Sequence, residues 1–135
     1  MTIAIVSGYF DPIHIGHLEL FRRAAKYGKV LVIINNDEQT ILKKGKPFMD
    51  QEERAIIVSA MRDVYSFEIS IDKDRTVRKT LEMIRESFED EKLIFVNGGD
   101  AVNVAEEETC RKLNIELKYG EGDKIQSSRW LLNPK

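Results

Sequence analysis

The chain is poor in the residues that mark several classes of protein. Its 135 residues include one cysteine, Cys110, so no disulfide can form within the chain. This composition fits a reducing compartment, and we expect a cytoplasmic location. No apolar run approaches the ~20 residues that span a bilayer, and the first residues show no signal-peptide pattern. The net charge of -2 argues against a broad nucleic-acid surface.

Two common phosphate-binding patterns are also missing. Gly45-Lys46 is followed by Pro47 rather than by Ser or Thr, so the segment is no P-loop, and the chain has no G-x-G-x-x-G sequence. Histidine is equally scarce: the chain has two, His14 and His17, three residues apart. A phosphate site in this chain must therefore be built from these histidines and a few lysines or arginines.

The apolar pattern predicts strands that alternate with helices. Apolar runs predict strands at 3–6, 30–34, 64–71, 93–96 and 115–119, and helical spacing predicts helices near 18–25, 76–89, 104–113 and 127–132. Runs that are apolar at every position are typical of parallel strands covered on both faces. The sequence therefore predicts a single domain over 1–135: an α/β, Rossmann-like, doubly wound sheet of five parallel strands.

Between the second and third strands we expect a long connection over residues 38–50. A further helix then begins at Asp50, which caps it together with Glu53 three residues later. Arg54 is expected either to face the ligand site or to pair with Asp50 on the helix surface. The buried face of this helix is predicted to consist of Ile56, Ile57, Ala60 and Met61.

The two histidines lie where the first strand turns into the first helix. Backbone N–H groups at a helix start are unpaired and carry partial positive charge, which suits a phosphate group. Gly16 places no side chain between the histidines, and Gly8 is expected to allow the tight turn that ends the strand. The imidazoles can supply N–H donors or positive charge to phosphoryl oxygens.

Other polar segments fall at the carboxyl ends of the predicted strands. They are Asp37 with the lysines at 43, 44 and 46, the segment Asn97–Asp100, and the loop that leads into Ser127. Ligands of doubly wound sheets bind beyond this edge. We therefore expect these segments to meet the histidines there.

The run G-x-F-D-x-x-H-x-G-H resembles the signature of the nucleotidylyltransferase superfamily; it stands at Gly8, Phe10, Asp11, His14, Gly16 and His17. Three further segments extend the resemblance. Residues 43–47 resemble the second basic region of cytidylyltransferases, and residues 98–100 resemble the Gly-Gly-Asp turn of heptose-phosphate cytidylyltransferases. Residues 125–129 resemble the C-terminal Ile-Ser-Ser-Thr motif. There Gln126 replaces a serine, and Glu121 stands near the position of a family arginine.

The resemblance implies which residues act. Catalytic roles fall to His14, His17, Lys44 and Lys46, although the pattern does not decide which of the three loop lysines contacts phosphate. Asp11 is expected to orient a histidine, to help hold hydrated Mg²⁺, or to shape the turn with Pro12. The residues implied in nucleotide binding are Gly8, Tyr9, Phe10, Asp11, Gly16, Lys43, Asn97, Gly98, Asp100, Ile125, Ser127, Ser128 and Arg129.

The resemblance also implies a reaction and its partners. CTP and a small phosphorylated alcohol or sugar phosphate would give a CDP-linked product and pyrophosphate, with Mg²⁺ on the triphosphate and a homodimeric enzyme. One alternative is an ATP-dependent adenylyltransferase of the kind that makes NAD, coenzyme A or FAD. Others are a nucleotide-binding module without turnover, to which Gln126 and Glu121 point, and a flavodoxin-like domain with no triphosphate site.

Overall fold

The computed structural model describes residues 1–98 and 103–119. These residues form five parallel strands, in the order β3-β2-β1-β4-β5 across one sheet, and five helices. In chain order the elements are β1 (Thr2–Gly8), α1 (Ile15–Ala24), β2 (Lys29–Ile34), α2 (Asp37–Lys44), α3 (Gln51–Ser59), β3 (Val64–Ile69), α4 (Arg78–Ser87), β4 (Lys92–Val96), α5 (Val104–Lys112) and β5 (Glu116–Lys118). The predicted five-stranded parallel sheet is confirmed.

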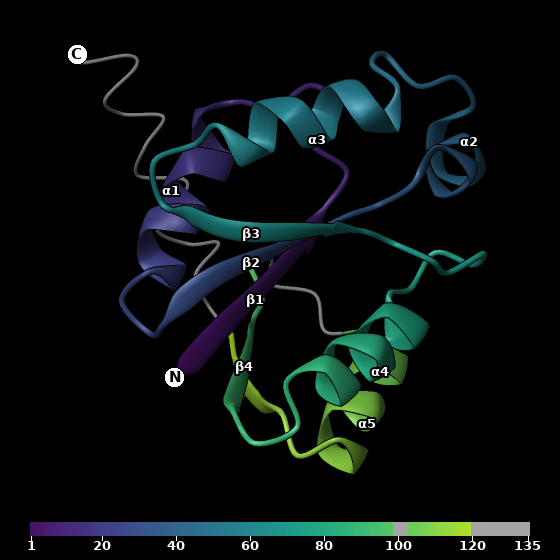
Figure 1. The fold of residues 1–135 in the computed structure, drawn as a ribbon. Helices are drawn as coiled ribbons and strands as arrows, with labels where there is room; N and C mark the ends of the chain where they lie inside the picture. Colours follow the sequence, from purple (N-terminus) through teal and green to yellow (C-terminus); the bar gives the residue numbers. More distant parts are fainter. Residues whose placement is uncertain (99–102, 120–135) are drawn as a thin grey trace.

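Helices cover both faces of the sheet (Figure 1). Along β1, Ala4 and Val6 face one way and pack in a core with α1 and α3. Ile3 and Ile5 face the other way and pack in a second core with α4 and α5. Because successive side chains of a strand point to opposite faces, both sets of positions must be apolar. The continuous apolar runs in the sequence follow from this two-sided burial.

The strand order reverses beside β1. The chain runs from β1 outward to β2 and β3, and β4 then returns to the other side of β1, with Ile5 opposite Phe95. Gly8 therefore ends one strand close to where Val96 ends its neighbour. A crevice beyond the carboxyl ends of the strands at such a reversal is where open α/β sheets bind ligands.

Helix α2 corrects one prediction, because residues 38–50 were expected to form a connecting loop and the helix takes up residues 37–44. The Asn36 side chain accepts a hydrogen bond from the Gln39 N–H (2.8 Å), and the Gln39 side chain accepts one from the Asn36 N–H (3.1 Å). This reciprocal pair is a capping box, which satisfies two N–H groups at the helix start. The helix ends at Gly45, whose φ of 94° suits glycine.

The buried face of α3 is also corrected. Asp50 caps the helix as predicted, by accepting a hydrogen bond from the Glu53 N–H (2.8 Å). The buried residues of the helix are Arg54, Ala55 and Val58, whereas Ile56 is 69% exposed. Of the other predicted residues, Met61 does pack against the core, Ile57 is half-buried and Ala60 is exposed. Apolar residues occupy almost every position from 55 to 61, so the sequence pattern alone does not select one face.

The remaining boundaries differ from prediction by a few residues. β3 ends at Ile69, and α4 begins at Arg78. The buried Asp72 carboxylate lies between them and accepts hydrogen bonds from the N–H groups of Lys79 (2.8 Å) and Thr80 (3.0 Å). It therefore caps the start of α4 from outside the helix. Within the described part of the chain, no helix has the length and apolar content needed to cross a membrane.

Candidate active site

A cavity of about 620 Å³ opens beyond the carboxyl ends of β1 and β4. It combines the histidine segment, the end of α2 and the residues that follow β4. The predicted convergence of these three segments is therefore confirmed for the described residues. The lining residues are Ser7, Gly8, Tyr9, Phe10, Asp11, Pro12, His14, Gly16, His17, Leu20, Lys43, Lys44, Asn97 and Gly98.

The two histidines form the N-terminal cap of α1. The Gly16 N–H donates to Nδ1 of His14 (3.1 Å), and the His14 N–H donates to Nδ1 of His17 (3.0 Å). Since a backbone N–H can only donate, each Nδ1 must present its lone pair. The proton of each neutral ring is therefore on Nε2. The backbone thus fixes both imidazoles as Nε2–H donors at the positive end of a helix.

His17 is a neutral donor at physiological pH. Its ring lies edge-on to Phe10, with a centroid separation of 4.8 Å, and 3.9 Å from the ring of His14. Burial is the main cause that lowers the pKa of His17 to about 4, and the charge of His14 lowers the pKa further. A protonated His17 would be poorly solvated here, so its chemistry is hydrogen-bond donation rather than transfer of a proton at neutral pH.

Phe10 packs against His17, and its ring explains why residue 8 is a glycine. Phe10 is buried with a φ of 53°, a conformation that non-glycine residues rarely adopt. A Cβ atom at Gly8 would lie 2.9 Å from the Phe10 ring. Gly8 is the last residue of β1, as expected, and the absence of a side chain there leaves room for this ring. The Phe10 ring in turn supports His17 from below.

The Asp11 carboxylate is committed to the loop after α2. Oδ1 accepts the Met49 N–H (2.7 Å), and Oδ2 accepts the Phe48 N–H (2.8 Å) and pairs with Nζ of Lys44 (2.8 Å). Burial raises the pKa of Asp11, but the hydrogen bonds from Lys44, Phe48 and Met49 outweigh burial and the net pKa is lowered. None of the three roles expected for Asp11 includes these contacts, which join it to the loop after α2 rather than to the turn with Pro12. It shapes the site by holding the loop, and no hydrogen bond joins it to either histidine in the described structure.

The three lysines of the basic cluster are placed differently. Lys43 and Lys44 line the cavity, whereas Lys46 is not among the lining residues. Lys43 Nζ lies 4.3 Å from the centroid of the Tyr9 ring, and Lys44 Nζ is held by Asp11. The cavity lining therefore gives no support to the catalytic role that the resemblance implied for Lys46.

Arg54 lies beneath the site and is 1% exposed. Its guanidinium donates to the carbonyls of Tyr9 (2.7 Å), Asn35 (2.7 Å) and Met49 (3.1 Å), and it pairs with Asp37 (2.7 Å). Neither expected position is correct, since Arg54 lies neither in the cavity lining nor in a surface pair with Asp50. It ties the histidine segment, the end of β2 and the loop after α2 together. Sequence gave no direct signal for this, because a charged residue is rarely buried.

A metal site made by protein ligands alone does not fit the described residues. They contain no group of three His, Cys, Asp or Glu side chains placed to hold a metal ion. Asp11 is the one carboxylate among the described lining residues, and its oxygens already accept from Lys44, Phe48 and Met49.

Some predicted residues lie outside the described part of the chain. These are Asp100, Ile125, Ser127, Ser128 and Arg129, together with Gln126, Glu121 and the helix expected over 127–132. Other lining residues were missed by prediction: Ser7, Pro12 and Leu20. Pro12 and Ser7 adjoin the signature, and Leu20 lies one helical turn beyond His17 on the same face, which is the signal that would have found it.

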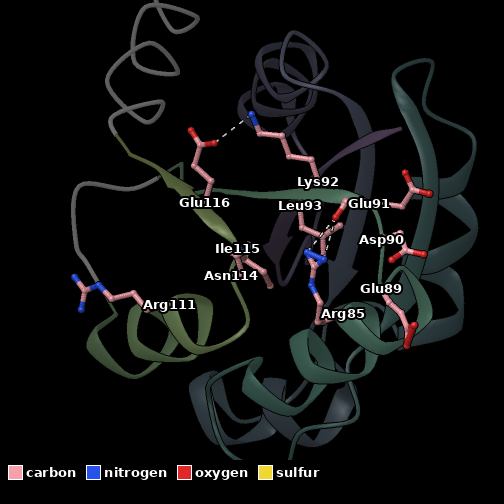
Figure 2. Close-up of a pocket in the computed structure, with 10 residues that line it drawn as sticks. All are labelled: Arg85, Glu89, Asp90, Glu91, Lys92, Leu93, Arg111, Asn114, Ile115 and Glu116. Carbon is pink, nitrogen blue, oxygen red and sulfur yellow. Dashed lines mark hydrogen bonds and ion pairs between the residues drawn. The ribbon is translucent and has the colours of Figure 1, made fainter.

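A second, larger cavity of about 760 Å³ lies at the opposite end of the sheet, beside the amino ends of β4 and β5 (Figure 2). Its charged groups compensate one another. Lys92 reaches toward Glu116 (3.5 Å), and Arg85 donates to the carbonyl of Glu91 (2.9 Å). Of these two cavities, only the one that holds the histidines combines a helix N-terminus with positive side chains.

Comparison with known proteins agrees with this geometry. Residues 5–128 match the family model described as Cytidylyltransferase-like. The bifunctional protein HldE of Geobacter metallireducens is 33% identical over 101 residues, which cover 73% of this chain and 19% of that protein. FAD synthase of Archaeoglobus profundus is 36% identical over 64 residues, which cover 47% of this chain and 41% of that protein. Ethanolamine-phosphate cytidylyltransferase of Arabidopsis thaliana is 40% identical over 65 residues, covering 46% of this chain and 15% of that protein.

The matched HldE proteins are much longer than this chain, which spans about a fifth to a quarter of their length. A solved structure, the lipopolysaccharide core biosynthesis protein from Thermoplasma volcanium, superimposes with a TM-score of 0.66 over 88% of this chain and 93% of that one. Its sequence identity of 21% supports a shared fold. Because the family model covers most of the residues from the first strand onward, the chain belongs to the cytidylyltransferase-like family.

Proposed function

We propose that the protein is a nucleotidylyltransferase that transfers CMP from CTP to a small phosphorylated alcohol or sugar phosphate and releases pyrophosphate. The observation that carries this proposal is the pair of imidazoles whose Nδ1 atoms accept backbone N–H groups at the start of α1. That arrangement orients two Nε2–H donors beside a helix N-terminus, in a cavity that two lysines also line. Family membership supports the same reaction class.

The proposed reaction is an in-line displacement at phosphorus. An oxygen of the acceptor phosphate attacks the α-phosphorus of CTP, a new P–O bond forms, and the bond to the β-phosphate oxygen breaks to release pyrophosphate. The protein supplies positioning and electrostatic stabilisation rather than a covalent intermediate. His14 and His17 donate hydrogen bonds to the phosphoryl oxygens as negative charge moves onto the leaving group.

Mg²⁺ enters this proposal as part of the substrate. The metal neutralises charge on the triphosphate, while Asp11 stays with Lys44 and the loop. We also propose a homodimer, on the family resemblance alone, and a cytoplasmic location, on the single cysteine. Light scattering of the purified chain tests the dimer.

The second candidate is transfer of AMP from ATP. The observation that favours it is the similarity to FAD synthases, which covers 47% of the chain for the Archaeoglobus profundus protein. The arrangement of the histidines suits either nucleotide, because the imidazoles would donate hydrogen bonds to the phosphates and not to the base. The acceptor phosphate and the release of pyrophosphate are common to both candidates.

The experiment is a measurement of pyrophosphate release with Mg²⁺ and each of CTP, ATP, GTP and UTP, against a panel of polyol and sugar phosphates. The proposal predicts release that needs both a phosphorylated acceptor and CTP. Release with ATP alone would move the assignment to the second candidate. Binding of nucleotide without release under any combination would identify a module that has lost turnover.

A further inference from the structure

Helix α2 is held in place by hydrogen bonds rather than by an apolar face. Its buried residues are Gln39 and Thr40, both polar, and neither apolar core of the described chain contains an α2 residue. Its apolar residues Ile41 and Leu42 are instead 55% and 56% exposed. Because most helices are fixed by packing of an apolar face, the position of α2 depends unusually on its polar contacts.

The Gln39 side chain joins α2 to the residues between β3 and α4, 70–77, which we call the bridging loop. Gln39 is 0% exposed, and its Nε2 donates to the carbonyls of Asp74 (2.6 Å) and Thr76 (2.8 Å). Its Oε1 accepts from the Asn36 N–H (3.1 Å). Both donors and the oxygen of this carboxamide are thereby used. The first turn of α2 is therefore fixed to the bridging loop.

The first turn of α5 is held to the same loop by Glu106. Oε2 of Glu106 accepts the N–H of Val77, the last residue of the bridging loop (2.9 Å). Val77 is 1% exposed and begins α4 without a side-chain cap, so Glu106 supplies the partner of a buried donor. The buried residues of α5, Thr109 and Cys110, lie beyond its first turn, and Val104 is 63% exposed. Buried side chains therefore do not fix this turn.

The Glu106 carboxylate occupies this position against an electrostatic cost. Burial raises the pKa of Glu106, and the carboxylates of Asp72 and Asp74 raise it further. The hydrogen bond from Val77 lowers the pKa but does not outweigh these effects. It follows that an uncharged acceptor of the same shape would make the contact at least as well.

The bridging loop lies outside the histidine cavity, since none of residues 70–77 is among the described residues that line it. At one end the loop holds α2, whose last turn brings Lys43 and Lys44 to the cavity. At the other end it holds α5, which follows the lining residues Asn97 and Gly98 in the chain. The loop therefore connects two parts of the chain that supply lining residues from separate elements.

We propose that Gln39 and Glu106 are positioning residues for the nucleotide. Through the bridging loop they hold the end of α2 and the residues after β4 in the relative position that one bound nucleotide requires. Because each side chain holds one end of the same loop, loss of either contact breaks the connection. The inference rests on the proposed function for the identity of the nucleotide, and its test measures binding separately from turnover.

The first measurement is the Kd of CTP with Mg²⁺, by isothermal titration calorimetry of the full chain and its variants, with ATP and Mg²⁺ as the second probe. Glu106→Leu removes the acceptor for the Val77 N–H and is expected to raise the Kd about tenfold, an effect typical of residues that act on a ligand from a distance. Glu106→Gln keeps an acceptor oxygen and should bind as the wild type does.

The matched control is Glu107→Leu, which makes the same substitution at the next position of α5. The Glu107 carboxylate pairs with Arg111 (3.4 Å) and accepts from the Tyr119 hydroxyl (3.1 Å), so it has no printed contact with the bridging loop. This variant should leave the Kd unchanged.

Gln39→Leu tests the other end of the loop and should also raise the Kd about tenfold. The double variant Gln39→Leu with Glu106→Leu should bind no more weakly than the weaker single variant, because both contacts belong to one connection. Independent effects would instead multiply to about a hundredfold. A side chain that only stabilises the fold would lower the melting temperature without this pattern of affinities.

Hydrogen exchange supplies a second readout, which needs no turnover. In the wild type, bound nucleotide should slow amide exchange in the bridging loop, although the loop lines no part of the cavity, because both of its ends are then fixed. This protection should disappear in Glu106→Leu and persist in Glu107→Leu. If Gln39→Leu does not fold, these exchange measurements decide the inference.

The inference is overturned if Glu106→Leu binds nucleotide as tightly as Glu107→Leu does, or if Glu106→Gln binds as weakly as Glu106→Leu. It is also overturned if the effects in the double variant multiply, if nucleotide does not protect the loop, or if the wild type binds neither probe. Failure of the proposed function looks different. In that case nucleotide affinity still depends on Glu106, but no acceptor supports release of pyrophosphate.

Discussion

The two cavities at opposite ends of the sheet show that volume does not locate a site. The larger cavity, at the amino ends of β4 and β5, is lined by three basic and four acidic side chains, several of which satisfy one another. The smaller cavity has one acidic side chain among its described lining residues, Asp11, and Lys44 neutralises it. Lys43 and the start of α1 then leave a net attraction for anions. The direction of the strands places this positive edge where the strand order reverses.

The largest expected difference between the two regions is in stability and concerns one arginine from each. Arg54→Met leaves the buried carbonyls of Tyr9, Asn35 and Met49 without a donor, and each unsatisfied group costs about 1–3 kcal/mol. We expect a loss of about 4 kcal/mol in the free energy of unfolding, measured by urea denaturation.

Arg85→Met in the amino-end cavity is the matched comparison, since the Arg85 guanidinium donates hydrogen bonds to the carbonyl of Glu91. Its expected cost is about 1 kcal/mol. Equal losses of unfolding free energy in the two variants would mean that the buried arginine contributes no more to stability at the histidine end of the sheet than Arg85 does at the other end.

The next effect is on turnover. His14→Ala or His17→Ala should reduce pyrophosphate release by about 10²-fold or more, because each removes a donor that stabilises the transition state. Loss of the cap should cost about 1 kcal/mol of stability, so the variants remain folded.

Glu116→Gln in the amino-end cavity is the control and should turn over at the wild-type rate. A melting temperature that falls in proportion to activity would identify the histidines as a structural pair and break the distinction between the two cavities.

A smaller effect follows from the low pKa of His17. Between pH 6.5 and about 4 the unfolded chain binds a proton at His17 and the folded chain does not. The free energy of unfolding therefore falls as pH falls, by at most about 1.4 kcal/mol per pH unit from this residue.

Urea denaturation at pH 5, 6 and 7 measures this slope, and His17→Gln should flatten it. Asp11 does not interfere, since its lowered pKa places its contribution to stability below this window. An unchanged slope in His17→Gln would show that burial of the imidazole does not control its protonation.

The smallest effect is expected at the exposed charges of the amino-end cavity. Lys92→Gln removes a 3.5 Å pair with Glu116, in which both side chains are well exposed. Such pairs contribute about 0–1 kcal/mol, and we expect a change within 0.5 kcal/mol. A much larger loss, measured by the same denaturation, would show that the second cavity also depends on its charge network.

The sheet and the placement of the histidines could be predicted because local patterns determine them. Apolar runs predict the strands. Helical spacing that starts just after the histidines predicts the first helix, so the histidines must lie at its start. α2 was missed because lysines and glycine suggested a loop, although Asn36 and Gln39 form a readable capping box.

Long-range contacts account for what the sequence could not show. The Asp11 carboxylate meets Phe48 and Met49 only after the loop has folded back, and Arg54 becomes buried because three carbonyls from separate segments converge on it. Nothing in the local pattern distinguishes Lys43 from Lys44. Their different contacts follow from the partners, Tyr9 and Asp11, that the fold brings to them.

The most direct test of the account is a thermal shift of the wild-type chain with Mg²⁺ and each nucleoside triphosphate, repeated on the Glu116→Gln variant of the amino-end cavity. A ligand at 100 times its Kd stabilises the folded state by about 2.7 kcal/mol, which raises the melting temperature by several degrees. We predict that CTP stabilises both proteins equally and more than the other nucleotides do. No shift with any triphosphate, or a shift that Glu116→Gln abolishes, would contradict the assignment of the nucleotide to the histidine cavity.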